Sequence, residues 1–176
     1  MSVLAQQTTY NGAYDFPTSE SIGQAFIAGA AVTGKKVTSV SFWLVRSGTP
    51  GGTGVAKIYA ATGTPGTDGK PTGSALAVSG SINLNDISNI PGVVSLTFSG
   101  ADQITLVNGT SYCVQWEPSV AGGTGVYYNS SNIDSNQNFD YGTPPSWTPD
   151  NTGDVYFLLY GIDVAVVSSS GMMLLF

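Results

Sequence analysis

The sequence contains no histidine. Histidine is the commonest general base and the commonest metal ligand at neutral pH, so its absence excludes most nucleophile–base pairs and most zinc sites. The sequence also lacks a Gly-x-Ser-x-Gly elbow, and it has no glycine-rich loop ending in Lys-Ser or Lys-Thr that would cradle a phosphate. These absences predict a protein that is not an enzyme, with no catalytic residues and no cofactor.

A pair of carboxylates is the one catalytic arrangement that remains open, because glycoside hydrolysis needs only two. Glycosidases usually need a deep groove and a larger scaffold, so we favour the non-enzymatic interpretation. The candidate carboxylates are Glu117, Asp134, Asp140, Asp150 and Asp154.

Cysteine and long apolar runs are scarce as well. The single cysteine, Cys113, cannot form an internal disulfide, and the alternating segment around it predicts a strand with a buried thiol. No apolar run reaches the 18 residues of a membrane span. Met1–Gln7 has neither the basic region nor the apolar core of a signal peptide.

Positive charge is rare and confined to one part of the chain. There are 5 basic and 11 acidic residues, and residues 71–176 contain eight acids and no lysine or arginine. No basic patch could neutralise several phosphates, so we expect no nucleic-acid partner and no anionic membrane. The asymmetry has two interpretations: drift on a solvated surface, or oppositely charged faces that meet in an assembly.

Glycine and aromatic residues are abundant instead. The chain has 23 glycines in 176 residues, against a usual frequency of about 7%. Together with nine prolines they interrupt the sequence almost everywhere, which predicts almost no helix. Short alternating segments separated by turn signals predict an all-β fold, a two-sheet antiparallel β-sandwich of jelly-roll type with about eight to ten short strands.

The clearest predicted strands and boundaries follow from alternation. We expect an N-terminal arm over residues 1–17, the sandwich domain over 18–167 and an apolar C-terminal tail over 168–176. Residues 130–151 are polar and aromatic with little alternation, which predicts a long ordered loop. The best-defined strands are predicted at Lys36–Arg46, Gly92–Phe98, Thr110–Glu117 and Asp154–Gly161.

Several segments between Ile22 and Tyr160 together resemble a known kind of module. They are Ile22–Phe26, Val37–Leu44, Ala56–Ala60, Pro71–Ala77 and Leu106–Trp116. In this order they resemble jelly-roll modules of bacterial surface proteins and of tailed-phage virion proteins. The resemblance implies a virion or extracellular location, and it implies no catalytic residues.

Aromatic residues in the second half are candidate ligand contacts. Tyr127, Tyr128, Tyr141 and Trp147 lie among Asn, Asp and Gly residues, a composition suited to stacking on pyranose rings. The alternative is that these rings cover the core of their own loop. In residues 134–140, alternating Asp and Asn side chains could bind calcium or could cap the backbone of the loop, and both interpretations stay open.

The C-terminal tail is a candidate subunit contact because five apolar residues follow one another at a chain end. The tail either folds back onto the sandwich or docks on a neighbouring subunit. Its apolar residues are Met172, Met173, Leu174, Leu175 and Phe176.

Two functions are therefore expected. The first is a non-enzymatic structural or assembly protein, such as a phage capsid decoration protein or minor virion subunit, with further copies or other virion proteins as partners. The second is a carbohydrate-binding or adhesion module that contacts surface glycans.

Overall fold

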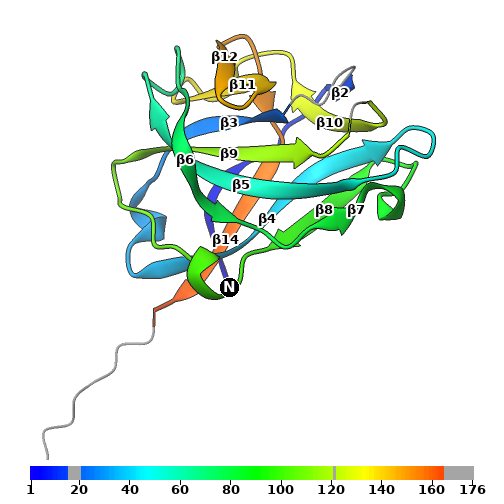
Figure 1. Ribbon diagram of the computed structural model, residues 1–176. Coiled ribbons are helices and arrows are strands. Elements are labelled where there is room, and N and C mark those ends of the chain that lie inside the picture. Colours follow the sequence, from blue (N-terminus) through cyan, green and yellow to red (C-terminus); the bar gives the residue numbers. More distant parts are fainter. Residues whose placement is uncertain (16–20, 121, 165–176) are drawn as a thin grey trace, which may run out of the picture.

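The computed structural model describes residues 1–15, 21–120 and 122–164, which form two antiparallel sheets packed face to face (Figure 1). The all-β, two-sheet sandwich that the sequence predicts is confirmed. The path of the chain as a jelly roll stays a prediction. Within the described residues, helical structure is limited to three single turns, η1 (Ala30–Val32), η2 (Leu84–Asp86) and η3 (Gly100–Asp102). None of these helices is long enough to cross a membrane.

The two sheets, which we call sheet A and sheet B, contain seven described strands each. Sheet A consists of β1 (Ser2–Gln7), β2 (Gly12–Asp15), β4 (Lys35–Arg46), β8 (Gly92–Thr97), β10 (Thr124–Asn129), β13 (Asp154–Val155) and β14 (Phe157–Asp163). Sheet B consists of β3 (Ser21–Ile27), β5 (Thr53–Thr62), β6 (Lys70–Val78), β7 (Ile82–Asn83), β9 (Ser111–Pro118), β11 (Gln137–Thr143) and β12 (Ser146–Asp150).

Strand β4 is the longest strand of sheet A and organises it. It pairs with β14 and then β10 along one side and with β8 along the other. Successive side chains of a strand point to opposite faces, and Val40, Phe42 and Leu44 are all fully buried between the sheets. The alternation that predicted this strand is therefore the alternation that builds the core.

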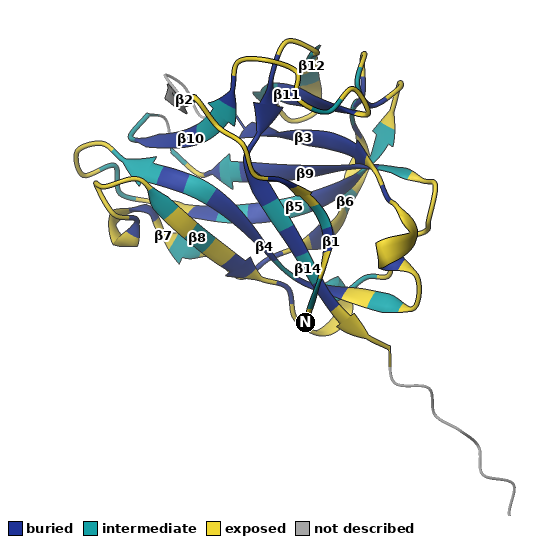
Figure 2. Ribbon diagram, turned by 180° about the vertical axis from the view of Figure 1, so that it is seen from behind, coloured by how far each residue is buried: buried dark blue, intermediate teal, exposed yellow. Residues whose placement is uncertain are grey.

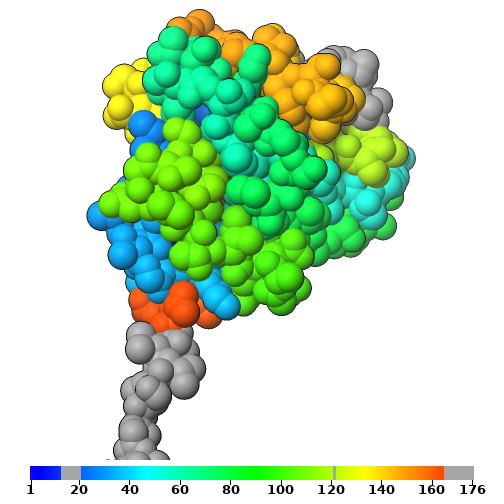
Figure 3. All heavy atoms as spheres, turned by 60° about the vertical axis from the view of Figure 1, so that its left-hand side comes forward, coloured from blue at the N-terminus to red at the C-terminus, as the bar shows by residue number. Residues whose placement is uncertain are grey.

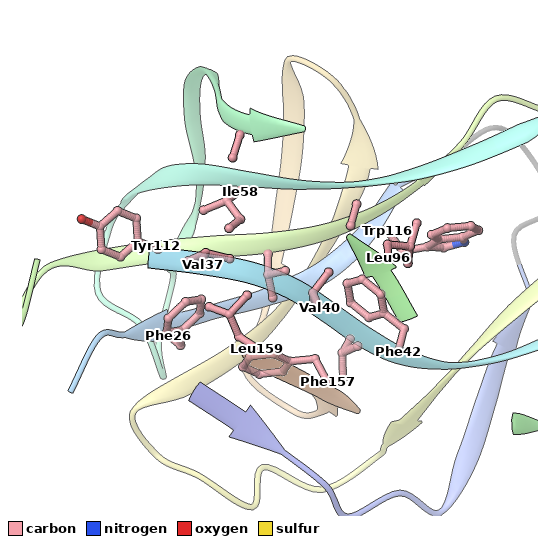
Figure 4. Packing of buried hydrophobic residues seen from close by; sticks show 14 of the residues in the cluster. Phe26, Val37, Val40, Phe42, Ile58, Leu96, Tyr112, Trp116, Phe157 and Leu159 are labelled. Carbon is pink, nitrogen blue, oxygen red and sulfur yellow. The ribbon is translucent and has the colours of Figure 1, made fainter. Parts of the chain in front are cut away.

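The core lies between the inner faces of the two sheets (Figure 4). Phe42 and Phe157 of sheet A meet Phe26, Ile58 and Trp116 of sheet B, and all five side chains are almost completely buried. Burying a large apolar side chain contributes roughly 1.5–3 kcal/mol, so this layer supplies much of the stability of the sandwich.

Three of the four best-defined predicted strands are confirmed as β4, β8 and β9 within a residue or two. The fourth, Asp154–Gly161, is divided at Tyr156 into two strands with different partners. The residues before Tyr156 form β13, which pairs with β10, and those after it belong to β14, which pairs with β4. The described residues contain fourteen strands, more than the eight to ten expected. Several of the additional strands are very short, such as β7 and β13.

The segment 1–17 was expected to be an arm, but the structure places two strands of sheet A within it. β1 pairs with β14, and β2 pairs with β10. A β-bulge between Val3 and Ala5 shifts the register of β1. Because a bulge breaks the two-residue period, this strand does not show the simple alternation that sequence patterns detect.

The prediction of a long loop over residues 130–151 is wrong. Strands β11 and β12 form a hairpin there, and β11 pairs with β3 along the whole of its other side. Pro149 lies in β12, which is an edge strand, where a proline costs no ladder hydrogen bond. The prolines and Asx residues that suggested a loop are therefore compatible with an edge hairpin.

The predicted tail over residues 168–176 lies outside the described residues.

Gly54 gives a test of the packing in sheet B. A Cβ atom at this position would lie 2.1 Å from Cη2 of Trp116, which is fully buried. We expect Gly54→Ala to lower the free energy of unfolding by about 1–3 kcal/mol, as overpacking of a rigid core does. Gly29→Ala is the matched control, because no atom lies within 4 Å of its Cβ position. Equal urea midpoints for the two variants would contradict this packing.

Candidate functional site

Four aromatic residues gather on the outer face of sheet A, and we call them the aromatic cluster. Trp43 belongs to β4 and points away from the core, opposite to Phe42. Tyr127 comes from β10, Tyr156 from the link between β13 and β14, and Tyr10 from the segment after β1. Four separate parts of the chain thus meet at one place.

The rings of the aromatic cluster pack mainly in tilted and edge-to-face arrangements. The ring of Tyr10 lies 4.2 Å from that of Trp43 and 5.2 Å from that of Tyr127, and the rings of Trp43 and Tyr156 are 5.2 Å apart at 89°. Such geometry is favourable between aromatic quadrupoles. Tyr156 is buried below the other rings of the cluster, whereas 38% of Tyr10 is exposed. The cluster is therefore closed toward the sheet and open to solvent at Tyr10.

The aromatic cluster contains no acidic or basic residue. Burial raises the pKa of Tyr156, and the neighbouring Tyr160 and Tyr10 raise it further, so its phenol keeps its proton at physiological pH. The apolar surface extends onto β8, where Val93 pairs with Trp43 and is 53% exposed. We call the aromatic cluster together with Val93 the contact face. It offers apolar area and hydroxyl groups, which suits binding by contact.

The structure divides the four aromatic residues that the sequence grouped as a ligand site. Tyr127 lies in the contact face. Its neighbour Tyr128 points to the opposite side of β10 and stacks on Phe139, with ring centroids 5.8 Å apart and planes at 16°. Tyr141 also packs against Phe139 and the main core. Trp147 lies on the outer face of sheet B against Tyr59.

Tyr10, Trp43 and Tyr156 were not among the predicted contact residues. Trp43 carried a signal, because a large ring at an outward position of a strongly alternating strand is unusual for a solvated face. Tyr10 and Tyr156 carried none, since they reach the cluster from irregular segments that only the tertiary fold brings together. The predicted contacts at Met172–Phe176 lie outside the described residues.

A second group of polar side chains lies buried on the outer face of sheet B. Nε2 of Gln115 donates a hydrogen bond to Oδ1 of Asp140 at 2.5 Å, and both side chains are fully buried. The amide can cross to β11 because the residue between them is Gly23, whose Cβ would lie 2.6 Å from Cδ of Gln115. Cys113, predicted to be buried, is confirmed as buried in the same region.

Burial dominates the electrostatics of this polar group. It raises the pKa of Asp140 well above the ordinary carboxyl range, although hydrogen bonds from Gln115 and Cys113 act in the opposite direction. The pKa of the Cys113 thiol is also raised well above its usual range, first by burial and then by Asp140. Burial therefore favours the protonated forms of Asp140 and Cys113, and a protonated thiol is a poor nucleophile.

The two edge strands of sheet B, β6 and β12, approach each other over this polar group. Tyr59 and Trp147 pack edge to face at 5.8 Å, and Trp147 rests on the small cluster that contains Ala25 and Cys113. Figure 3 shows the residues of the β5–β6 hairpin lying against β12. This part of the outer face of sheet B is thus covered by the chain itself, unlike the contact face of sheet A.

A shallow hollow of about 190 Å³ lies beside this cover, at the ends of β5 and β9. Two of its lining residues form an ion pair, with Nζ of Lys57 2.6 Å from Oε2 of Glu117. The hydroxyl of Tyr59, which does not line the hollow, donates to Oε1 of Glu117 at 2.7 Å. Burial, followed by Glu117, raises the pKa of Tyr59. Both carboxylate oxygens of Glu117 are engaged, so this candidate carboxylate is arranged as an ion-pair and hydrogen-bond acceptor.

The alternating side chains of residues 134–140 point to different partners. Asp134 accepts hydrogen bonds from the amides of Asn136 and Gln137, and Asn138 binds backbone groups of Gly66 and Gly69 across the sheet. Asp140, at the end of this series, faces Gln115 instead. In the described part of the chain, no three acidic or cysteine side chains lie together as a metal site would require.

Asp154 binds the backbone of the segment that leads into β11. Its Oδ2 accepts the backbone N–H groups of Ile133 and Asp134, and its Oδ1 accepts Nε2 of Gln24. Burial raises its pKa, partly offset by these hydrogen bonds. Asp154 is therefore engaged in supporting the loop.

Comparison with known proteins finds no matching family model, no matching curated protein and no matching solved structure. The contact face is therefore interpreted from its own geometry.

Asp140 predicts a specific pH dependence of stability. In the unfolded chain its carboxyl ionises near 3.8, whereas the folded protein retains the proton to higher pH. Stability therefore falls as pH rises from about 4 towards the raised pKa of the folded state. Asn at this position keeps an acceptor for Gln115 and supplies an N–H without ionising. We expect Asp140→Asn to raise the free energy of unfolding at pH 7 by about 1 kcal/mol or more, because Asn has no carboxyl whose raised pKa opposes folding and each pKa unit is worth about 1.4 kcal/mol.

The measurement is urea denaturation of both proteins between pH 4 and pH 8. The gain should shrink as the pH approaches 4. Asp86→Asn, which removes an exposed carboxyl in η2, is the control and should change stability little at any pH. A variant less stable than the parent at pH 7 would show that Asp140 is needed as an anion.

Proposed function

We propose that this protein is a non-enzymatic assembly subunit that works through contacts with further copies of itself or with other structural proteins, as a component of a virion or of an extracellular surface. The observation that supports it is the contact face. The aromatic cluster on sheet A has an exposed part at Tyr10, whereas the aromatic pair on the outer face of sheet B, Tyr59 and Trp147, packs against the chain itself.

The composition of the contact face suits protein contact. Tyrosine and tryptophan are enriched at protein interfaces because they bury a large area and lose little conformational entropy. The inner part of the cluster is preformed, since Tyr156 is buried and Trp43 packs against both Tyr156 and Tyr10. A preformed surface loses less entropy on binding than a mobile one.

A capsid decoration protein or a minor virion subunit is the specific form of this proposal. The resemblance of the strand segments to phage and bacterial surface modules supports that form, and the scarcity of charge fits a subunit that packs against others. The predicted apolar tail at residues 168–176 would add a second contact with a neighbouring subunit.

The first test is the mass of the protein in solution. We expect sedimentation equilibrium to give species heavier than the 18.1 kDa monomer, in a concentration-dependent way. Tyr10→Ser combined with Tyr127→Ser should lower the average mass, because it removes the open top of the contact face. Val107→Ser, which removes a residue that is 60% exposed elsewhere on the surface, is the matched control. A strict monomer at every concentration would overturn the proposal.

Carbohydrate binding is the second candidate, and one observation favours it: Tyr10 presents an accessible ring and hydroxyl beside Trp43. Aromatic faces next to hydroxyl groups suit pyranose rings. On a glycan array, this function predicts a signal that Tyr10→Ser with Tyr127→Ser removes and that Trp147→Ala keeps. No signal from the parent protein would exclude it for the glycans on the array.

A further inference from the structure

The edge strands of the two sheets differ in how they are protected. A free edge exposes backbone N–H and C=O groups, and proteins usually block it with charge, proline, a bulge or a covering segment. In sheet B, β6 begins with Lys70 and Pro71, and β12 ends with Pro149 and Asp150. In sheet A, β1 contains a bulge and lies beside η1.

Strand β8 has no charge, no proline and no bulge. It forms the edge of sheet A next to β4, and the structure pairs it with no other described strand. Its six residues, Gly-Val-Val-Ser-Leu-Thr, include no charge and no proline. Its register with β4 runs without a shift from Ser39–Thr97 to Leu44–Gly92. β8 is thus an edge strand with no charge, no proline and no register shift, and Figure 2 shows it beside β4.

The backbone of β8 shows which groups are open. The N–H of Phe98 donates to the carbonyl of Thr38, so the alternate residues Leu96 and Val94 also face β4. Val93 and Ser95 must then direct their N–H and C=O groups away from β4. The carbonyl of Thr97, which has the same orientation, accepts the N–H of Gly80, so only that end of the edge is occupied.

We propose that β8 pairs antiparallel with β8 of a second copy of this chain, across a two-fold axis close to Val94, so that the two A sheets become continuous. This inference rests on the proposed assembly function and names its contact. Val93 would lie opposite Ser95 of the partner subunit. Each of the two equivalent pairs exchanges two backbone hydrogen bonds, which uses all four open groups of each strand.

The absence of charge on β8 points to a second copy as the occupant. In this register residue 93 of each copy faces residue 95 of the other, so like charges at these two positions would repel across the axis. Val93 and Ser95 are both uncharged, so this repulsion does not oppose pairing with a second copy. The exposed Val93 also lies beside Trp43, so pairing would extend the contact face across the axis.

Charge reversal tests this pairing. Val93→Lys with Ser95→Lys should place like charges across the axis and halve the mass of the two-fold species in sedimentation equilibrium. Val93→Glu with Ser95→Glu should do the same. Mixing the two variants should restore the dimer, because lysines then face glutamates. Thr72→Lys with Ser74→Lys adds the same charge to exposed positions of β6 and should leave the mass unchanged.

Hydrogen exchange tests the same pairing without any substitution. The amides of Val93 and Ser95 should be protected in the concentrated wild-type protein and should exchange quickly on dilution. The amides of Val94 and Leu96, which face β4, should stay protected at both concentrations and serve as the internal control.

The outcomes separate this inference from the proposed function. If the lysine variant has the same mass as the wild-type assembly, and the amides of Val93 and Ser95 exchange rapidly, the β8 contact is overturned but the assembly function stands. Protected amides without restoration on mixing would show that a different segment occupies the edge, which also overturns pairing between copies. A wild-type monomer at every concentration would overturn both proposals.

Discussion

The alternation of side chains along β4 is the constraint on which the rest of this structure depends. Because successive residues point to opposite faces, the strand that buries Phe42 and Leu44 in the core must also present Trp43 on the outside. The same strand pairs with β14, β10 and β8, so it positions both the elements that supply the aromatic cluster and the open edge. The alternation along β4 therefore determines both which of its side chains enter the core and which belong to the contact face.

The outer faces of the two sheets have opposite characters. In sheet B, Gly23 leaves room for Gln115 to reach Asp140, and the aromatic pair of Tyr59 and Trp147 packs above the neighbouring small residues. The chain itself covers this part of the surface. In sheet A, the rings support one another while Tyr10 and Val93 remain exposed. An intermolecular contact through sheet A therefore requires less rearrangement of the fold.

Much of the fold could be predicted from the sequence, and much less of the candidate site. Regular alternation identified β4, β8 and β9, because each has one face in the core. Strand β1 was missed because its bulge breaks that period, and the β11–β12 hairpin was missed because prolines at an edge resemble a loop. Tyr127 and Tyr128 are neighbours in sequence, yet they face opposite sides of a sheet. The aromatic cluster forms only when four distant segments meet, so composition alone could not assign its members.

The central claim is that the protein assembles through sheet A. Imaging of the assembled protein by electron cryo-microscopy tests it most directly, because the map shows which face of each sandwich meets its neighbour. We expect neighbouring subunits to meet at the aromatic cluster or at β8, with the outer face of sheet B directed to solvent. Subunits joined through the covered face of sheet B, with Tyr10 and Val93 left in solvent, would contradict it.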